Sequence, residues 1–331
     1  MKKNKFVVIG GITSKYAAIN LKLGKKYNTN EASIDILDWD TKEIVQYFRF
    51  TPDIKFRSED LGKDIRFTSG SWREDGKLML CSPTQAYVFD FENKEIVKEY
   101  NSTIYNDLHH ILPFRDGYLL ANTGLDSVVK INQSGEVEEI ISTNETAVWD
   151  KFRKDVDYRK VASTKPHTNH PNFVIDIDGE MWVTRFHNKD AVNVLDRSQK
   201  IDIAVGKPHD GHVFGDYIYF TTINGFIVKA DKITKEVVER YDLNAIDTRG
   251  KDLGWCRSLY VDGDIAYVGF TRLRQTAIES NLRWLKGTID NSVERLPARI
   301  AKYDLSRKTL IDEFEIPDGF TDLIFSILPA K

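Results

Sequence analysis

Short hydrophobic segments rich in Val, Ile, Tyr, Phe and Trp recur along the chain, separated by turn signals such as DG, GD, NG and NK. Such segments are typical of strands, because amphipathic helices need longer stretches with apolar residues three or four positions apart. Several segments follow a DG or GD turn and precede two further strand-like segments: GKLMLCS, GYLLANT, GEMWVTRF, DYIYFTT and DIAYVGF. The pattern therefore predicts repeated four-stranded units, as in a β-propeller.

The repeat units can be aligned on their turn glycines. In five units, the residue that opens the first strand precedes that glycine by six to nine positions: Ser69, His110, His170, His209 and Arg257. A sixth unit opens at Asp322, but the chain ends there, so residues 318–327 need partner strands from residues 5–50. This closure removes the exposed sheet edge. The sequence predicts a single domain over residues 1–331, an all-β, six-bladed propeller with four antiparallel strands per blade, whose terminal strands pair in one blade.

Four insertions lengthen the repeat, at residues 13–31, 51–66, 146–166 and 271–300. They fall between strands two and three of a blade, or between blades, and such loops emerge on one face of a propeller. We expect all four to cover the same mouth of the ring. Helical spacing of Ile278, Leu282 and Leu285 also predicts a short amphipathic helix over that mouth.

Composition restricts the class of protein. A chain of 331 residues with 41% hydrophobic residues can bury a sizeable core. Its glycine-interrupted start, MKKNKFVVIGGI, is typical of a strand rather than a signal peptide, and no apolar stretch approaches the roughly 18 residues of a membrane span. Two cysteines, Cys81 and Cys256, are too few for a disulfide framework. We therefore expect a cytoplasmic protein.

Charge is distributed unevenly. The net charge is −3, yet residues 13–31, 146–166 and 271–300 together contain 16 Lys or Arg against seven Asp or Glu. A basic mouth on an acidic body would attract a small anionic ligand, and we expect neither a nucleic acid nor a membrane as partner. The alternative is that these loops are simply solvated and rich in lysine.

The seven histidines all lie between residues 109 and 212. His110, His170 and His209 occupy equivalent positions in successive units, which predicts three imidazoles that converge on a divalent metal ion, zinc first and manganese, iron or nickel as alternatives. His212 is the rival to His209, although His109 and His212 are expected to point toward the blade walls. The alternative is that each histidine is a hydrogen-bonded channel residue.

Further residues are assigned roles around this predicted metal. Arg257 and Arg185 are expected to bind a carboxylate or stabilise an oxyanion, and Tyr158 and His167 are candidates for proton transfer. Asp210 is placed to orient an imidazole, or else to cap a turn. The predicted substrate-binding residues are Arg272, Arg274, His187 and Asp322, the last of which is also placed to complete the metal's shell.

The segment HPNFVIDIDGEMWVTRF and its sister repeats resemble those of NHL and SMP-30-like six-bladed propellers. Within that group, the peptidyl-α-hydroxyglycine α-amidating lyases hold a catalytic zinc with three histidines from different blades, and the resemblance implies such a role for His110, His170 and His209. The cysteines of those secreted enzymes are missing here, so peptide amidation is not implied. DLHHILPFRDGYLLANTG and WCRSLYVDGDIAYVGFTRLR also resemble a bacterial propeller family of unknown activity.

The sequence thus predicts a metal-dependent lyase or hydrolase, with epimerase chemistry next. Its substrate would be a small anion such as a carboxylated sugar or hydroxy acid, bound at the channel mouth. The alternative is a non-catalytic propeller that binds an acidic protein segment or a polyanion, because propellers also serve as interaction platforms.

Overall fold

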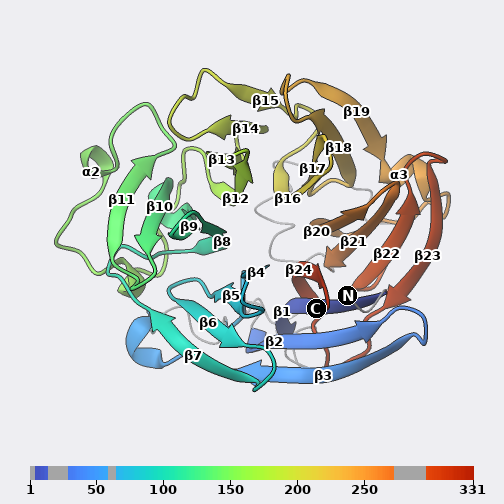
Figure 1. Ribbon diagram of the computed structural model, residues 1–331, viewed down its shortest axis with the longest axis horizontal. Coiled ribbons are helices and arrows are strands. Elements are labelled where there is room, and N and C mark those ends of the chain that lie inside the picture. The colour runs from blue at the N-terminus through green and yellow to red at the C-terminus, as the bar shows by residue number, and fades with distance from the viewer. Residues whose placement is uncertain (1–3, 14–28, 59–64, 272–295) are drawn as a thin grey trace, which may run out of the picture.

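The computed structural model describes residues 4–13, 29–58, 65–271 and 296–331. Six four-stranded antiparallel sheets form a ring, which confirms the predicted six-bladed propeller (Figure 1). The first blade closes the ring by pairing the two chain ends, in the order β24 (Leu323–Pro329), β1 (Lys5–Thr13), β2 (Thr29–Asp38) and β3 (Glu43–Phe50).

The other five blades follow in chain order, each from its innermost strand outward. Blade two contains β4 (Ser69–Trp72), β5 (Leu78–Cys81), β6 (Ala86–Asp90) and β7 (Glu95–Tyr100). Blade three contains β8 (Leu108–Phe114), β9 (Gly117–Asn122), β10 (Ser127–Asn132) and β11 (Val137–Ser142). Blade four contains β12 (Pro171–Ile177), β13 (Glu180–Arg185), β14 (Asp190–Asn193) and β15 (Lys200–Asp202). Blade five contains β16 (Pro208–Phe214), β17 (Tyr217–Thr222), β18 (Phe226–Asp231) and β19 (Val237–Asp242). Blade six contains β20 (Trp255–Asp262), β21 (Ile265–Thr271), β22 (Arg299–Asp304) and β23 (Thr309–Glu315).

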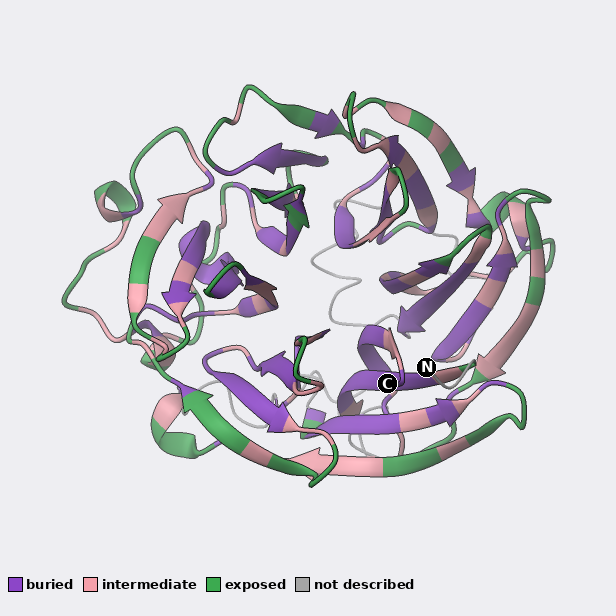
Figure 2. Cartoon of the chain, viewed as in Figure 1, coloured by how far each residue is buried: buried purple, intermediate pink, exposed green. Residues whose placement is uncertain are grey.

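The hydrophobic core lies between neighbouring blades. One cluster joins Met79 and Val88 of blade two to Leu120 and Val129 of blade three. The inner three strands of each blade are mostly buried, while most residues of the outermost strands are exposed or half-buried (Figure 2). This burial explains why the inner strands read as nearly continuous hydrophobic segments in the sequence.

Polar side chains of the innermost strands hydrogen-bond the next blade. Ser326 Oγ accepts the Gly70 N–H at 3.1 Å, joining blade one to blade two. At 3.1 Å, Ser69 Oγ accepts the Ile111 N–H, which joins blade two to blade three. These buried bonds fix the register between sheets that share no strand hydrogen bonds.

Five innermost strands carry a β-bulge near their first residues, including β12, whose register shifts between Pro171 and Val174. In β8, Leu108 pairs with Asn122 and His110 with Ala121, so His109 is an extra residue. The same register shift, one residue wide, occurs in β16, β20 and β24, where the extra residues are His209, Arg257 and Phe325. A bulge redirects the side chain of its extra residue.

The insertions are partly described. Residues 51–58 contain η1 (Ile54–Phe56), and residues 146–166 contain α2 (Val148–Lys151) and η4 (Tyr158–Lys160). These two segments contact each other, since Lys160 Nζ donates to the Arg57 carbonyl at 3.2 Å and Arg159 lies over the Phe56 ring. Most of 13–31 and 271–300, including Arg272, Arg274 and the predicted helix with Ile278, Leu282 and Leu285, lies outside the described residues.

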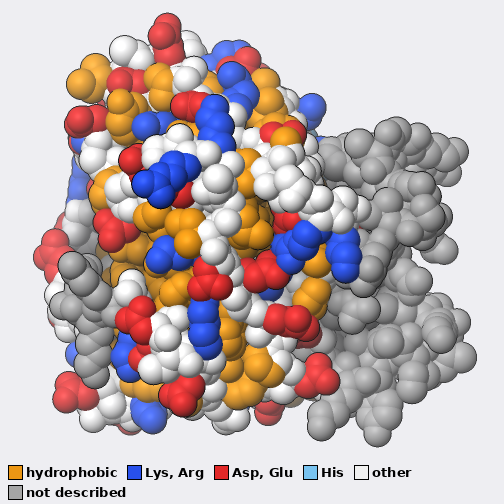
Figure 3. Space-filling view, turned by 90° about the vertical axis from the view of Figure 1, so that its right-hand side faces the viewer, with side chains coloured by type: hydrophobic (Ala, Val, Ile, Leu, Met, Phe, Trp, Pro, Cys, Tyr) orange, Lys and Arg blue, Asp and Glu red, His pale blue; other side chains and the backbone are white. Residues whose placement is uncertain are grey.

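Charges of both signs mix over the outer edge of the ring (Figure 3). Ion pairs there include Arg249 with Glu313 at 2.6 Å and Lys308 with Glu239 at 2.7 Å. Within the described residues, no helix is long and apolar enough to cross a bilayer. Cys81 and Cys256 are both buried and unpaired, and burial raises the pKa of the Cys81 thiol to about 11.

Candidate functional site

Five of the seven histidines form one group at the start of the innermost strands, which we call the histidine cluster: His109, His167, His170, His187 and His209. The His109 ring centre lies 5.1 Å from that of His170 and 6.2 Å from that of His209. The His170 ring centre lies 5.0 Å from that of His167 and 5.6 Å from that of His187. Residues from three neighbouring blades therefore meet, as the sequence predicted for His170 and His209.

His110 occupies a different place from the one predicted. Its ring stacks on Phe173 of the next blade, with ring centres 3.7 Å apart, and its Nε2 lies 3.3 Å from Ser71 Oγ. The bulge in β8 explains the difference, because it makes His109 the extra residue that joins the cluster and leaves His110 in the wall between blades. Burial lowers the pKa of His110 to about 3, so this wall imidazole is neutral.

His212, the predicted rival to His209, also lies in a blade wall. Its Nδ1 accepts the Val261 N–H at 3.2 Å, and its ring contacts Tyr260. Asp210 acts similarly, since its Oδ2 accepts the Leu259 N–H at 3.2 Å. Both side chains join blade five to blade six. In this structure the Asp210 carboxylate thus hydrogen-bonds the backbone of the neighbouring blade and does not orient an imidazole.

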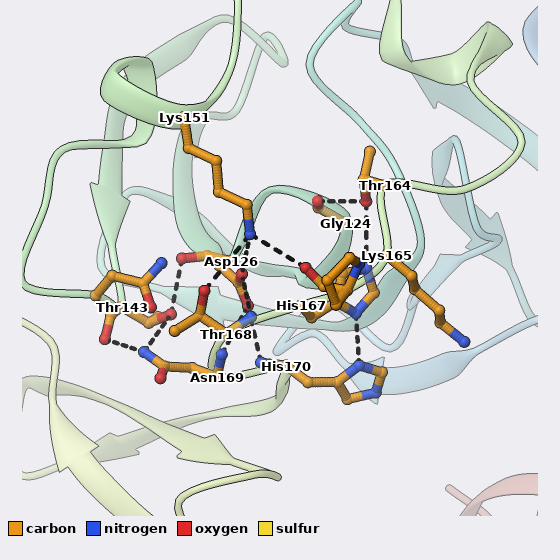
Figure 4. A network of polar contacts seen from close by, with 12 residues as sticks. Gly124, Asp126, Thr143, Lys151, Thr164, Lys165, His167, Thr168, Asn169 and His170 are labelled. Carbon is orange, nitrogen blue, oxygen red and sulfur yellow. Dashed lines mark hydrogen bonds and ion pairs between the residues drawn. The ribbon is translucent and has the colours of Figure 1, made fainter. Parts of the chain in front are cut away.

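A buried aspartate holds the loop that carries His167 and His170 (Figure 4). The Asp126 carboxylate accepts the backbone N–H groups of Thr168, Asn169 and His170, at 2.7, 3.0 and 2.8 Å. His170 has a φ of 55°, a left-handed conformation that is costly for a histidine. The three hydrogen bonds to one carboxylate stabilise this conformation. Burial raises the pKa of Asp126, but these N–H groups outweigh it and lower the pKa overall.

A chain of hydrogen bonds fixes the proton positions on two imidazoles. Thr164 donates its hydroxyl proton to the Gly124 carbonyl at 2.5 Å, so its oxygen accepts from His167 Nε2 at 3.2 Å. With its proton on Nε2, neutral His167 has a bare Nδ1, which must accept from His170 Nδ1, 2.7 Å away (Figure 4). His170 is therefore protonated on Nδ1, and its Nε2 carries a free lone pair.

His109 reaches the same state by a different bond. Its Nδ1 lies 2.8 Å from the Asp107 carbonyl oxygen, which can only accept, so Nδ1 carries the proton and Nε2 the lone pair. Metal-binding histidines commonly have this arrangement, with one nitrogen donating to a carbonyl and the other free to bind.

The imidazoles at the centre of the cluster are held neutral. Burial is the largest cause that lowers the pKa of His109, His170 and His209. The charge of Arg257 lowers the pKa of His209 further, whereas Asp107 partly opposes the shift at His109. Neutral imidazole is the form that binds metal ions.

The spacing of the cluster comes close to that of a metal site. Two imidazoles that bind one tetrahedral zinc through nitrogen have ring centres about 5 Å apart, given Zn–N distances of roughly 2.0–2.1 Å. The His109–His170 distance of 5.1 Å meets this requirement, while the His109–His209 distance of 6.2 Å exceeds it by about 1 Å. In the described part of the chain, no three His, Cys, Asp or Glu side chains are already placed to hold an ion. Of the two ring distances that involve His109, one therefore matches a zinc site and the other is too long by about 1 Å.

Two guanidinium groups flank the cluster. Arg257 and Arg66 both lie over the Phe325 ring, at 4.6 and 5.7 Å, and the Phe325 ring centre is 6.1 Å from that of His209. Burial, with a smaller contribution from Lys189, lowers the pKa of Lys207 to about 8. The sequence predicts Arg257 as a residue of this site. It gives no indication of Arg66, Lys207 or Phe325.

Other predicted site residues are engaged elsewhere. Arg185 forms a two-pronged ion pair with Asp190, with N–O distances of 2.9 and 2.6 Å. The buried Tyr158 hydroxyl accepts the Arg153 N–H at 2.8 Å, and the Tyr158 ring packs in a hydrophobic cluster. Asp322 accepts the Thr13 N–H at 2.9 Å. Tyr158 and Arg185 therefore stabilise the fold around the mouth instead of facing the histidines.

A cavity of about 170 Å³ adjoins the cluster. It shares walls with the cluster, because His167 and Asp107 line it and Arg66 reaches from it toward Phe325. Both described insertion segments contribute to its lining, which agrees with the expectation that they cover one mouth.

No protein family model matches the chain, and neither does any curated protein. Among solved structures, the chain is similar to a protein of unknown function from Bacteroides caccae, with 12% identity over 98% of each chain and a TM-score of 0.63. It also matches the WD40 domain of Neurospora crassa Pan2, with 11% identity, a TM-score of 0.48, and 78% and 68% of the two chains covered. A third match is hydrazine synthase of Kuenenia stuttgartiensis, with 13% identity and a TM-score of 0.47. This match covers 71% of the present chain and 62% of the other chain. At such low identity, the first similarity shows the propeller fold alone.

Proposed function

We propose that this propeller is a metal-dependent enzyme that binds a divalent ion, zinc first, through His109, His170 and His209. The observation that carries the proposal is the shared state of His109 and His170, which are half-buried, neutral and protonated on Nδ1 at a ring distance of 5.1 Å. His109 replaces His110 in the triad inferred from the sequence. With this assignment, the proposed site still resembles the three-histidine site of propellers in the NHL and SMP-30-like group.

The proposed substrate is a small anion such as a hydroxy acid or a carboxylated sugar. A bound divalent ion would act as a Lewis acid toward a substrate oxygen or lower the pKa of a water molecule. Arg257 and Arg66, held over Phe325 beside His209, would neutralise the substrate's negative charge. Lyase or hydrolase chemistry follows from these groups, and epimerisation would share the proton-abstraction step. The proposed compartment is the cytoplasm.

The experiment is a metal-restored activity screen. Protein stripped with a chelator would be assayed against hydroxy acids and carboxylated sugars, before and after addition of zinc, manganese, iron or nickel. We expect turnover that returns with one of these ions and is lost in His109→Ala, but kept in His212→Asn, whose histidine lies in a blade wall. Tight metal-independent binding of an acidic peptide or polyanion without turnover would instead favour a binding platform.

A further inference from the structure

The three proposed metal-binding histidines differ in what holds their rings. His109 donates from Nδ1 to the Asp107 carbonyl oxygen at 2.8 Å, and His170 donates from Nδ1 to His167 at 2.7 Å. The His209 side chain makes no hydrogen bond to the residues that the structure describes, although it is only 7% exposed. Because a metal-binding histidine almost always donates its second nitrogen to an acceptor, the proposed site still needs an acceptor for His209.

A buried acceptor without a partner lies on the neighbouring innermost strand. Asn172 is 1% exposed, and its side-chain oxygen, Oδ1, accepts no hydrogen bond within the described part of the chain. Its nitrogen, Nδ2, donates to the Pro208 carbonyl at 3.1 Å, and this bond identifies which end of the amide is the oxygen. A buried acceptor in this state is costly, and native structures rarely leave one unpaired.

The local fold places this amide next to His209. Asn172 lies in the bulge of β12, between Pro171 and Val174, and a bulge redirects the side chains that it contains. The amide hydrogen-bonds the carbonyl of Pro208, the residue directly before His209 at the start of β16. The unpaired oxygen and the imidazole that needs an acceptor thus belong to adjoining parts of blades four and five.

Binding of an ion would bring the two groups closer. The His209 ring centre is 6.2 Å from that of His109, so the two rings must approach by about 1 Å to share a zinc ion. Blade four, which carries Asn172, lies between the blades of these two histidines in the ring (Figure 1). A His209 ring that moves toward His109 therefore moves toward the start of β12.

We propose that Asn172 positions His209 for metal binding: its Oδ1 accepts a hydrogen bond from His209 Nδ1, which leaves Nε2 to bind the ion. Asn172 supplies to His209 the kind of acceptor that the Asp107 carbonyl supplies to His109. The inference rests on the proposed function, because the acceptor is used when an ion is bound.

The test is metal binding by untagged protein, with zinc affinity measured by competition against a chromophoric chelator and ligand geometry by the cobalt absorption spectrum. Asn172→Ala removes the oxygen, and we expect zinc affinity to fall by about 10- to 100-fold, with a changed cobalt spectrum. Asn172→Asp keeps an oxygen at this position and adds a negative charge, so it should bind zinc at least as tightly as the wild type.

A purely structural role for Asn172 predicts a different order. Asn172→Asp would then be at least as impaired as Asn172→Ala, because a carboxylate loses the 3.1 Å hydrogen bond to the Pro208 carbonyl. Asn193→Ala is the matched control. It removes another buried asparagine of blade four, whose side chain hydrogen-bonds Glu180 and the backbone of residues 195 and 196, and it should bind zinc like the wild type.

A second readout follows the ring proton itself. In zinc-loaded protein labelled with ¹⁵N-histidine, a hydrogen-bonded Nδ1 proton exchanges slowly with water and gives a signal. Asn172→Ala should lose one such signal, and Asn172→Asp should keep it. Thermal unfolding shows whether each variant is folded.

Zinc affinity in folded Asn172→Ala within about twofold of the wild type, or equal losses in Asn172→Ala and Asn193→Ala, would overturn this proposal and leave the proposed function standing. A wild type that binds no divalent ion would overturn the proposed function, and this inference with it. Should Asn172→Ala fail to fold, Asn172→Asp decides, because weaker zinc binding than the wild type in that variant contradicts the positioning role.

Discussion

His170 donates a hydrogen bond from Nδ1 to Nδ1 of His167, 2.7 Å away, and this one contact leaves His170 Nε2 free to bind a ligand. Neither residue alone specifies this arrangement. It depends on Thr164, whose proton is committed to the Gly124 carbonyl and whose oxygen therefore accepts from His167. In the proposed metal site His167 would position His170, while the acid or base role expected from the sequence stays a prediction.

His167→Ala is therefore expected to weaken metal binding by about 10- to 100-fold, which is typical for loss of a group that orients a metal-binding imidazole. Competition with a chromophoric chelator measures the affinity, and the absorption spectrum of the cobalt-substituted protein reports the ligand geometry. His167→Asn should restore part of the affinity, because its amide oxygen can accept from His170. Wild-type affinity and an unchanged cobalt spectrum in His167→Ala would refute the positioning role.

Asp126 is expected to be the main anchor of the loop that carries His170. Asp126→Asn should lower the free energy of unfolding by about 2–4 kcal/mol, because the amide's N–H₂ group would face backbone N–H groups and the charge-assisted hydrogen bonds would be lost. Urea unfolding monitored by tryptophan fluorescence gives the value.

The matched control is Lys151→Met, which removes only the partly exposed cation 3.3 Å from Asp126. Its effect should stay below about 1 kcal/mol, as for other exposed ion pairs. An equal loss of stability in Lys151→Met and Asp126→Asn would mean that the ion pair, and not the backbone N–H groups, fixes the loop.

His212 should make stability depend on pH. Burial lowers its pKa from 6.5 to about 4, so below pH 6.5 the unfolded chain takes up a proton that the folded chain excludes. The wild type should therefore lose up to about 3 kcal/mol relative to a variant without this group, progressively from pH 6.5 to pH 4.

His212→Asn provides that variant, since its amide oxygen can still accept the Val261 N–H. The free energy of unfolding of both proteins, measured at several pH values, gives the difference directly. The wild type should be the more stable protein at pH 7.5, and its advantage should shrink as the pH falls. A difference that is constant with pH would show that His212 titrates normally in the fold.

The fold was predictable because its signals are local. Turn signals such as Asp178–Gly179 separate hydrophobic segments, and the unpaired last strand required a partner at the N-terminus. Both follow from how backbone hydrogen bonds and apolar surface must be satisfied in a propeller. The number of blades and the closure between β24 and β1 could therefore be inferred from the amino-acid sequence alone.

The site was less predictable because a bulge shifts it by one residue. LHHIL contains His109 and His110 side by side, and no residue type in it indicates which one is the extra residue of β8. Similarly, Phe325 takes the channel position that the sequence assigned to Asp322. The role of Asp126 depends on a carboxylate that meets N–H groups more than 40 positions along the chain, a relation that leaves no sequence pattern.

Elemental analysis of untagged protein tests the central claim most directly. After exposure to zinc, manganese, iron or nickel and removal of excess ion, the wild type and His212→Asn should retain about one divalent ion per chain, and His109→Ala, His170→Ala and His209→Ala should lose it. Thermal unfolding confirms that each variant is folded. A wild-type chain that retains no ion, or a folded His109→Ala that keeps the full complement, would contradict the account.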